Sequence, residues 1–150
     1  MATTFSEVYD QFLMIVTDYN LITLYNASVT DFETYLSGWL IPAITDFSSC
    51  NQSLSYSGTT FSLVLTEENI KILAMLMKKY WLEKQIADIR QMALHVQDKN
   101  FKTFAEANNL TAKLKLYTEQ KEEVSQALVS YGLADNNKWV NWLAGNFFTA

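Results

Sequence analysis

Apolar residues recur every three or four positions along most of the chain, and this spacing predicts a largely α-helical protein. The pattern is clearest between residues 103 and 131, where a helix-start motif at Thr103 and Glu106 opens a continuous stripe. We expect this seam helix to pack lengthwise against another helix and to end at Gly132. The stripe consists of Ala107, Leu110, Leu114, Tyr117, Lys121, Val124, Leu128 and Tyr131.

Lys121 is the one charged residue in that stripe. A lysine at such a position usually lays its apolar stem along the neighbouring helix and keeps its ammonium group in solvent. It can instead form a salt bridge to another subunit. Both interpretations are compatible with the sequence.

Three more helix starts carry a Ser or Thr whose hydroxyl can accept a hydrogen bond from the first free backbone N–H groups. They lie at Thr4, Ser28 and Thr66. The helix after Thr66 is apolar on nearly all sides between Ile70 and Leu82. Such a pattern is typical of the central helix of a bundle, or of a helix whose outer face contacts a partner.

The helix expected at about residues 28–49 contains the only proline of the chain, Pro42. A proline ring inside a helix clashes with the preceding turn, which predicts a kink. The stretch that follows, residues 48–65, is polar at first and then alternates apolar and polar residues from Phe61 to Leu65. This composition predicts an extended arm or a short hairpin.

With 150 residues, 49% of them hydrophobic, the chain is long enough for one core and shows no division into two. We therefore predict a single-domain, all-α helical bundle of about five helices. This domain spans residues 1–132, and residues 133–150 form an aromatic-rich C-terminal docking segment. That segment carries Trp139, Trp142, Leu143, Phe147 and Phe148.

The C-terminal segment needs a surface to dock on, because a chain end frays unless it is packed. It can dock on its own core or on another protein, where Trp and Phe anchors supply much of the binding energy. Insertion at a membrane surface is less well supported, because the Lys and Arg residues that accompany such segments are lacking.

The formal net charge of −5 argues against an electrostatic grip on nucleic acid, which requires clustered Lys and Arg. An acidic surface is nevertheless compatible with DNA passing nearby, since it repels the phosphates of the duplex and does not bind them. The longest apolar stretch, Ile72 to Met77, is far short of the roughly 20 residues that cross a bilayer. We therefore expect neither specific DNA binding nor a membrane partner.

Residues that carry chemistry are few. His95 and Cys50 are the only histidine and cysteine, and the four glycines are isolated, so neither a metal cluster nor a phosphate-binding loop is indicated. The acidic pairs Glu67–Glu68 and Glu122–Glu123 lack the helical histidine partner of carboxylate-bridged metal sites. We expect no enzymatic activity, no catalytic residue, no metal and no cofactor.

Three stretches together resemble the head-tail connector proteins of tailed bacteriophages, also called adaptor, neck or head-completion proteins. They read FETYLSGWLIPAITDF, LTEENIKILAMLMKKYWLEKQI and KNFKTFAEANNLTAKLKLYTEQKEEVSQALVSYG. The resemblance covers residues 21–131 and rests on the order of the helices. It also rests on short phrases such as Thr66-Glu67-Glu68, Trp81-Leu82-Glu83 and the run from Phe101 to Leu110.

The resemblance implies a structural virion protein, assembled in the host cytoplasm and located in the neck between head and tail. Such protomers form a ring, commonly a dodecamer, that extends the DNA channel beneath the capsid portal. Their partners are the portal protein, a tail-side neck or tail-completion protein and further copies of the same chain, while double-stranded DNA passes through without specific binding.

For this chain, the resemblance implies portal docking by the aromatic residues of the C-terminal segment. Lateral contacts between subunits would involve Tyr56, Phe61, Leu63 and Lys121. The rival interpretation is a small cellular helical-bundle regulator or binding module without enzymatic activity, whose C-terminal segment folds onto its own core.

Overall fold

A computed structural model describes residues 2–95 and 103–147, with side chains described for residues 2–91 and 108–134. The predicted all-α fold is confirmed, because five helices account for most of the chain and the described strands form a single two-stranded hairpin. In chain order the elements are α1 (Phe5–Ile15), α2 (Tyr19–Ala27), α3 (Val29–Asp46), β1 (Tyr56–Ser57), β2 (Thr60–Phe61), α4 (Glu67–His95) and α5 (Thr103–Phe147).

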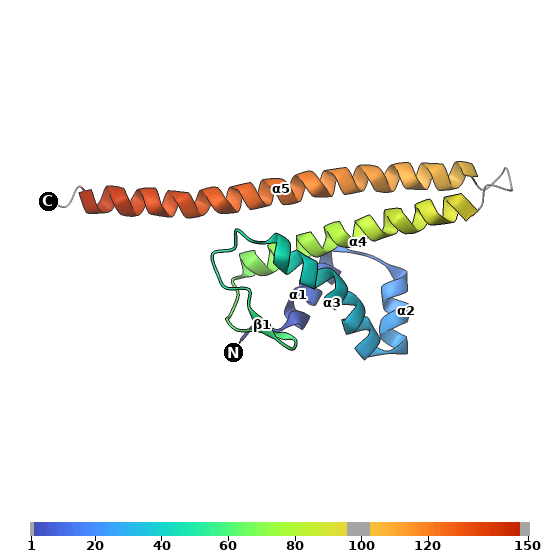
Figure 1. The fold of residues 1–150 in the computed structure, drawn as a ribbon, viewed down its shortest axis with the longest axis horizontal. Helices are drawn as coiled ribbons and strands as arrows, with labels where there is room; N and C mark the ends of the chain where they lie inside the picture. The colour runs from blue at the N-terminus through green and yellow to red at the C-terminus, as the bar shows by residue number, and fades with distance from the viewer. Residues whose placement is uncertain (1, 96–102, 148–150) are drawn as a thin grey trace.

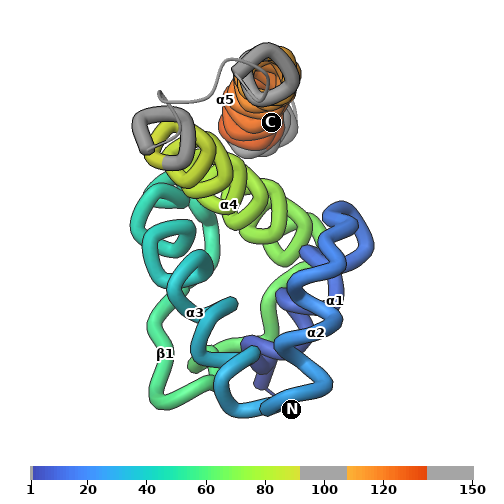
Figure 2. Tube along the Cα trace, turned by 90° about the vertical axis from the view of Figure 1, so that its right-hand side faces the viewer, coloured from blue at the N-terminus to red at the C-terminus, as the bar shows by residue number. Residues whose placement is uncertain are grey.

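Helix α4 is the central helix of the bundle. Every residue from Ile72 to Met77 is buried, because α1 and α3 pack on one side of α4 and α5 packs on the other (Figure 1). Viewed end-on, α3 and the α1–α2 pair lie below α4, and α5 lies above it (Figure 2). The nearly all-round apolar pattern therefore reflects burial within one protomer.

The predicted helix starts at Thr4, Ser28 and Thr66 are confirmed. The Ser28 hydroxyl accepts a hydrogen bond from the Asp31 N–H at 3.2 Å, and the Thr66 hydroxyl accepts one from the Asn69 N–H at 3.3 Å. At Thr4, the backbone N–H donates to the Glu7 carboxylate at 3.0 Å. These contacts satisfy backbone groups that a helix end leaves unpaired.

Two features of the N-terminal half differ from the sequence interpretation. Helix α2 was not predicted; its start is capped by the Asp18 carboxylate, which accepts a hydrogen bond from the Asn20 N–H at 2.9 Å. Helix α3 is shorter than the expected range of 28–49 and continues through Pro42 to Asp46. The kink at Pro42 stays a prediction.

The predicted short hairpin forms within residues 48–65, from Tyr56 to Phe61, and packs onto its own protomer. Strands β1 and β2 pair antiparallel around Gly58, whose φ of 60° suits a residue without a Cβ atom. Phe61 is 1% exposed, and its N–H donates to the Thr3 carbonyl at 2.9 Å. The extended-arm alternative is therefore wrong for this protomer, because the Phe61 ring fills the protomer's own core.

Helix α5 does not end at Gly132, as the sequence predicted, but continues to Phe147. A glycine inside a helix costs about 1 kcal/mol relative to alanine, which a 45-residue helix with good helix formers tolerates. In Figure 1 the C-terminal part of α5 runs past the first turn of α4, away from α1 and α3. The seam helix and the C-terminal segment thus share one continuous backbone.

The seam between α4 and α5 contains Val124 and Tyr131, as predicted, but not Lys121. Lys121 is exposed, and the neighbouring Gln120 is 3% exposed and takes the buried position instead. The assumed alternation of three-residue and four-residue steps predicted Lys121 at the buried position, one residue beyond Gln120, which is buried in the structure.

Leu73 tests the central role of α4. Replacement of this fully buried side chain by alanine is expected to lower the free energy of unfolding by about 2–5 kcal/mol, because it leaves a cavity. The matched control is Leu116→Ala on α5, where the side chain is 54% exposed and the expected change is within about 0.5 kcal/mol. Urea unfolding measures both, and similar losses for the two variants would contradict the central placement.

Candidate interaction surfaces

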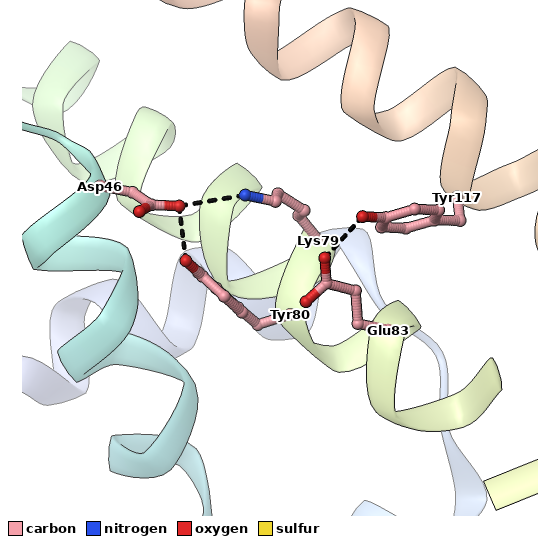
Figure 3. A network of polar contacts seen from close by, with 5 residues as sticks. All are labelled: Asp46, Lys79, Tyr80, Glu83 and Tyr117. Atoms are coloured by element: carbon pink, nitrogen blue, oxygen red, sulfur yellow. Dashed lines mark hydrogen bonds and ion pairs between the residues drawn. The ribbon is translucent and has the colours of Figure 1, made fainter. Parts of the chain in front are cut away.

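Polar side chains join α3 and α5 to α4 (Figure 3). Asp46, the last residue of α3, accepts hydrogen bonds from Lys79 at 3.0 Å and from the Tyr80 hydroxyl at 2.5 Å. On the next turn of α4, Glu83 accepts a hydrogen bond from the Tyr117 hydroxyl of α5 at 2.5 Å. The network therefore ties α3 and α5 to neighbouring turns of α4.

The protonation states in this network suit a structural role. The Tyr80 hydroxyl, assisted by Lys79, holds the pKa of Asp46 below its ordinary value. The hydrogen bond to Glu83 raises the pKa of Tyr117 to about 12, and burial followed by the bond to Asp46 raises the pKa of Tyr80. Asp46 is therefore ionised, and the Tyr80 and Tyr117 hydroxyls are protonated, near neutral pH.

A second network pins the 48–65 loop to the helices. The Tyr131 hydroxyl accepts a hydrogen bond from the Asn51 N–H at 2.9 Å and lies 3.9 Å from the Cys50 sulfur. The Gln52 side-chain oxygen Oε1 accepts hydrogen bonds from the buried Asn69 side-chain amide at 2.7 Å and from the Thr66 backbone N–H at 2.8 Å. This loop is therefore anchored to both α4 and α5, and Cys50 packs within it.

A groove of about 590 Å³ lies among α1, α2 and the start of α3. Its apolar lining includes Leu13, Ile22 and Tyr25, which are 37%, 56% and 53% exposed. Asp10, Asp18 and Glu33 supply its charged lining, which contains no basic residue. An open apolar groove with an acidic lining is suited to binding a protein surface with apolar and basic side chains.

The groove is continuous with a second one of about 450 Å³, which runs between α1 and α3 toward the β1–β2 hairpin. The two share Ser6, Tyr9 and Glu33 as lining residues. Burial, and then the Glu33 charge, raises the pKa of Tyr9 to about 12. This tyrosine is therefore a neutral hydrogen-bonding group at the junction of the two grooves.

The four residues predicted to contact other subunits differ in how far the structure exposes them. Tyr56 and Phe61 face each other across the hairpin, with Tyr56 41% exposed and Phe61 buried against Phe5. The predicted contact of Phe61 with another subunit is wrong, because its ring is buried in the core of its own protomer. Leu63, 45% exposed, and Lys121 are both available at the surface.

The residues predicted to dock on the portal lie outside the described side chains. Trp139, Trp142, Leu143 and Phe147 fall on the helical backbone of α5, whereas Phe148 lies beyond the described residues altogether. Their role in docking stays a prediction. The structural observation relevant to this docking role is the course of the α5 backbone in Figure 1.

The sequence interpretation missed the groove among α1, α2 and the start of α3, called the acidic groove below. Leu13, Ile22 and Tyr25 were not assigned to a surface, because α2 was not recognised and its relation to α1 depends on the fold. A signal was present in the sequence: residues 1–70 contain no Lys, Arg or His, so any surface that they build alone is neutral or acidic.

In the part of the chain that the structure describes, no group of three or more His, Cys, Asp or Glu side chains is placed to hold a metal ion. Among the described helices, none combines the length and the apolar character that a membrane span requires.

Comparison of the chain with models of protein families, with curated proteins and with solved structures finds no match.

Asp46 is expected to make stability depend on pH. Its pKa is lowered in the folded protein, so its contribution is present above the unfolded-state pKa of about 3.9 and is lost as pH falls through the folded value. The difference in free energy of unfolding between the wild type and Asp46→Asn should shrink between about pH 5 and pH 3. Urea titrations across this range measure it, and a difference that stays constant would contradict the assignment.

Tyr131 is expected to stabilise the 48–65 loop. Replacing it with phenylalanine keeps the ring but leaves the Asn51 N–H without its acceptor, which should cost about 1–2 kcal/mol. Tyr19→Phe is the matched control, because that ring is 80% exposed, and no change is expected. Urea unfolding gives the cost, and hydrogen exchange should show faster exchange at Asn51; unchanged exchange there would count against the contact.

Proposed function

We propose that this protein is a structural virion protein that forms a ring between the capsid portal and the tail of a tailed bacteriophage. It extends the DNA channel and joins head to tail through protein–protein contacts. The observation that carries the proposal is the course of the C-terminal part of α5, which runs on past the first turn of α4 (Figure 1).

The projecting part of α5 supports a docking role. Its sequence holds two tryptophans and a phenylalanine on one helical backbone, at Trp139, Trp142 and Phe147. A rigid helix presents such side chains to a partner at a lower entropic cost than a disordered tail does. We assign the portal as the partner of this segment, in line with the resemblance of the chain to connector proteins.

The charge of the chain supports a position beside DNA. A protomer with a net charge of −5 does not hold a passing duplex by its phosphates. The only ion pairs among the described residues lie on α3, α4 and α5, at Lys79–Asp46 and Lys115–Glu119. Helices α1, α2 and α3 contain no Lys, Arg or His, so their surface offers a duplex no basic contact.

The rival interpretation, a cellular helical-bundle regulator or binding module, predicted that the C-terminal segment packs onto its own core. In Figure 1 the C-terminal part of α5 runs on past the first turn of α4, away from α1 and α3, which favours a partner outside the protomer. We therefore retain the connector as the single proposed function.

The docking role is tested with the full-length protein, the purified portal and the double variant Trp139→Ala/Trp142→Ala. Loss of two anchors should weaken portal binding by about thirtyfold or more, because truncating one interface tryptophan can cost 2 kcal/mol. Asn141→Ala, within the same stretch of α5, is the control and should bind normally. Mass photometry and negative-stain images measure the enlarged portal complex.

A protein shortened after Gly132 gives an independent readout. If it binds the portal as the full-length protein does, the segment has no docking role. If the full-length protein neither forms a ring nor enlarges the portal, the connector proposal is wrong and the binding-module interpretation takes its place.

A further inference from the structure

The charged side chains of this protein are divided unevenly along the chain. Residues 1–70, which build α1, α2, α3 and the hairpin, hold eight acidic side chains and no Lys, Arg or His. Residues 71–150 hold all eleven Lys and Arg residues and eight acidic ones. The acidic groove belongs to the first part, so a partner with basic side chains is favoured there and an acidic one is repelled.

A basic surface of the same protomer lies on the other side of α1. A cleft of about 130 Å³ between α1, α4 and α5 is lined by Lys71 and Lys78, with Gln11 and Ile15 on α1 and Glu123 on α5. Lys71 and Lys78 are seven residues apart, two helical turns, and so project from one side of α4. Neither forms an ion pair with another described residue.

The groove and the lysine cleft are placed back to back. With 3.6 residues per turn, Gln11 and Ile15 lie about half a turn around α1 from Leu13 and Ser6, which line the groove. Two different surfaces on opposite sides of one protomer are what a head-to-tail contact requires. Repeating that contact closes a ring when the rotation between copies closes.

We propose that the lysine cleft of one copy docks on the acidic groove of the next. In this contact the Lys71 and Lys78 stems cover the exposed apolar lining of the groove, and their ammonium groups pair with Asp10 and Glu33. The partner is a second copy of this chain, because the chain itself carries the matching charge on the opposite side. This inference rests on the proposed ring and specifies its lateral interface.

Charge reversal on each surface tests the contact. One variant reverses the groove, Asp10→Lys/Glu33→Lys, and the other reverses the cleft, Lys71→Glu/Lys78→Glu. Each alone should weaken self-association by about tenfold or more, because like charges then face each other. An equal mixture of the two should restore association, since every contact between unlike copies again joins opposite charges.

The matched control is Asp88→Lys/Glu122→Lys, which makes the same change of charge at exposed positions on α4 and α5 outside both surfaces. It should self-associate as the wild type does. Sedimentation velocity over a range of protein concentrations measures association, and circular dichroism verifies that each variant folds. Association of the wild type should weaken as salt is raised, because exposed charge pairs are screened.

The contact is overturned by any of three results. The first is that the groove and cleft variants associate like the wild type. The second is that the two folded variants fail to associate when mixed. The third is that the wild type is monomeric at every concentration. Portal binding of the wild type is measured separately. A wild type that self-associates without forming a ring and ignores the portal refutes the proposed connector function and leaves the contact standing. A wild type that enlarges the portal but stays monomeric alone refutes the contact and leaves the connector function standing.

Discussion

Six consecutive residues of α4, from Ile72 to Met77, are buried together, and the rest of the fold depends on covering them. A helix that is apolar on all sides cannot remain at a surface, so α1, α3 and α5 each contribute one apolar face to it. The polar contacts follow this arrangement. Asp46 and Tyr117 reach α4 from opposite neighbours and fix which turns face each other.

Because the protomer covers α4 by itself, the surfaces left for partners lie elsewhere. The groove beside α1 remains open because α2 packs on α3 and leaves Leu13 and Ile22 partly exposed. The backbone of α5 runs on past the first turn of α4 toward its C-terminal end (Figure 1). In the proposed function, the groove serves lateral contacts and the end of α5 serves an axial partner.

Much of the fold could be predicted from the sequence, because it depends on local chemistry. Hydroxyl caps at Ser28 and Thr66 were identifiable from neighbouring residues, and the helical period marked the seam between α4 and α5. The candidate site was predicted less well. Tyr56 and Leu63 are exposed as a contact requires, whereas Phe61 is withdrawn into the core by the hairpin and the bridge to Thr4.

The sequence by itself determined the helical class, the position of most helix starts and the acidic character of the first 70 residues, since these follow from residue types and spacing. Only the tertiary structure decided that α5 passes through Gly132, that Gln120 rather than Lys121 is buried, and that α1 separates an acidic groove from a basic cleft. The physical reason is that each of these depends on contacts between elements distant in the chain, which outweigh local preferences of about 1 kcal/mol.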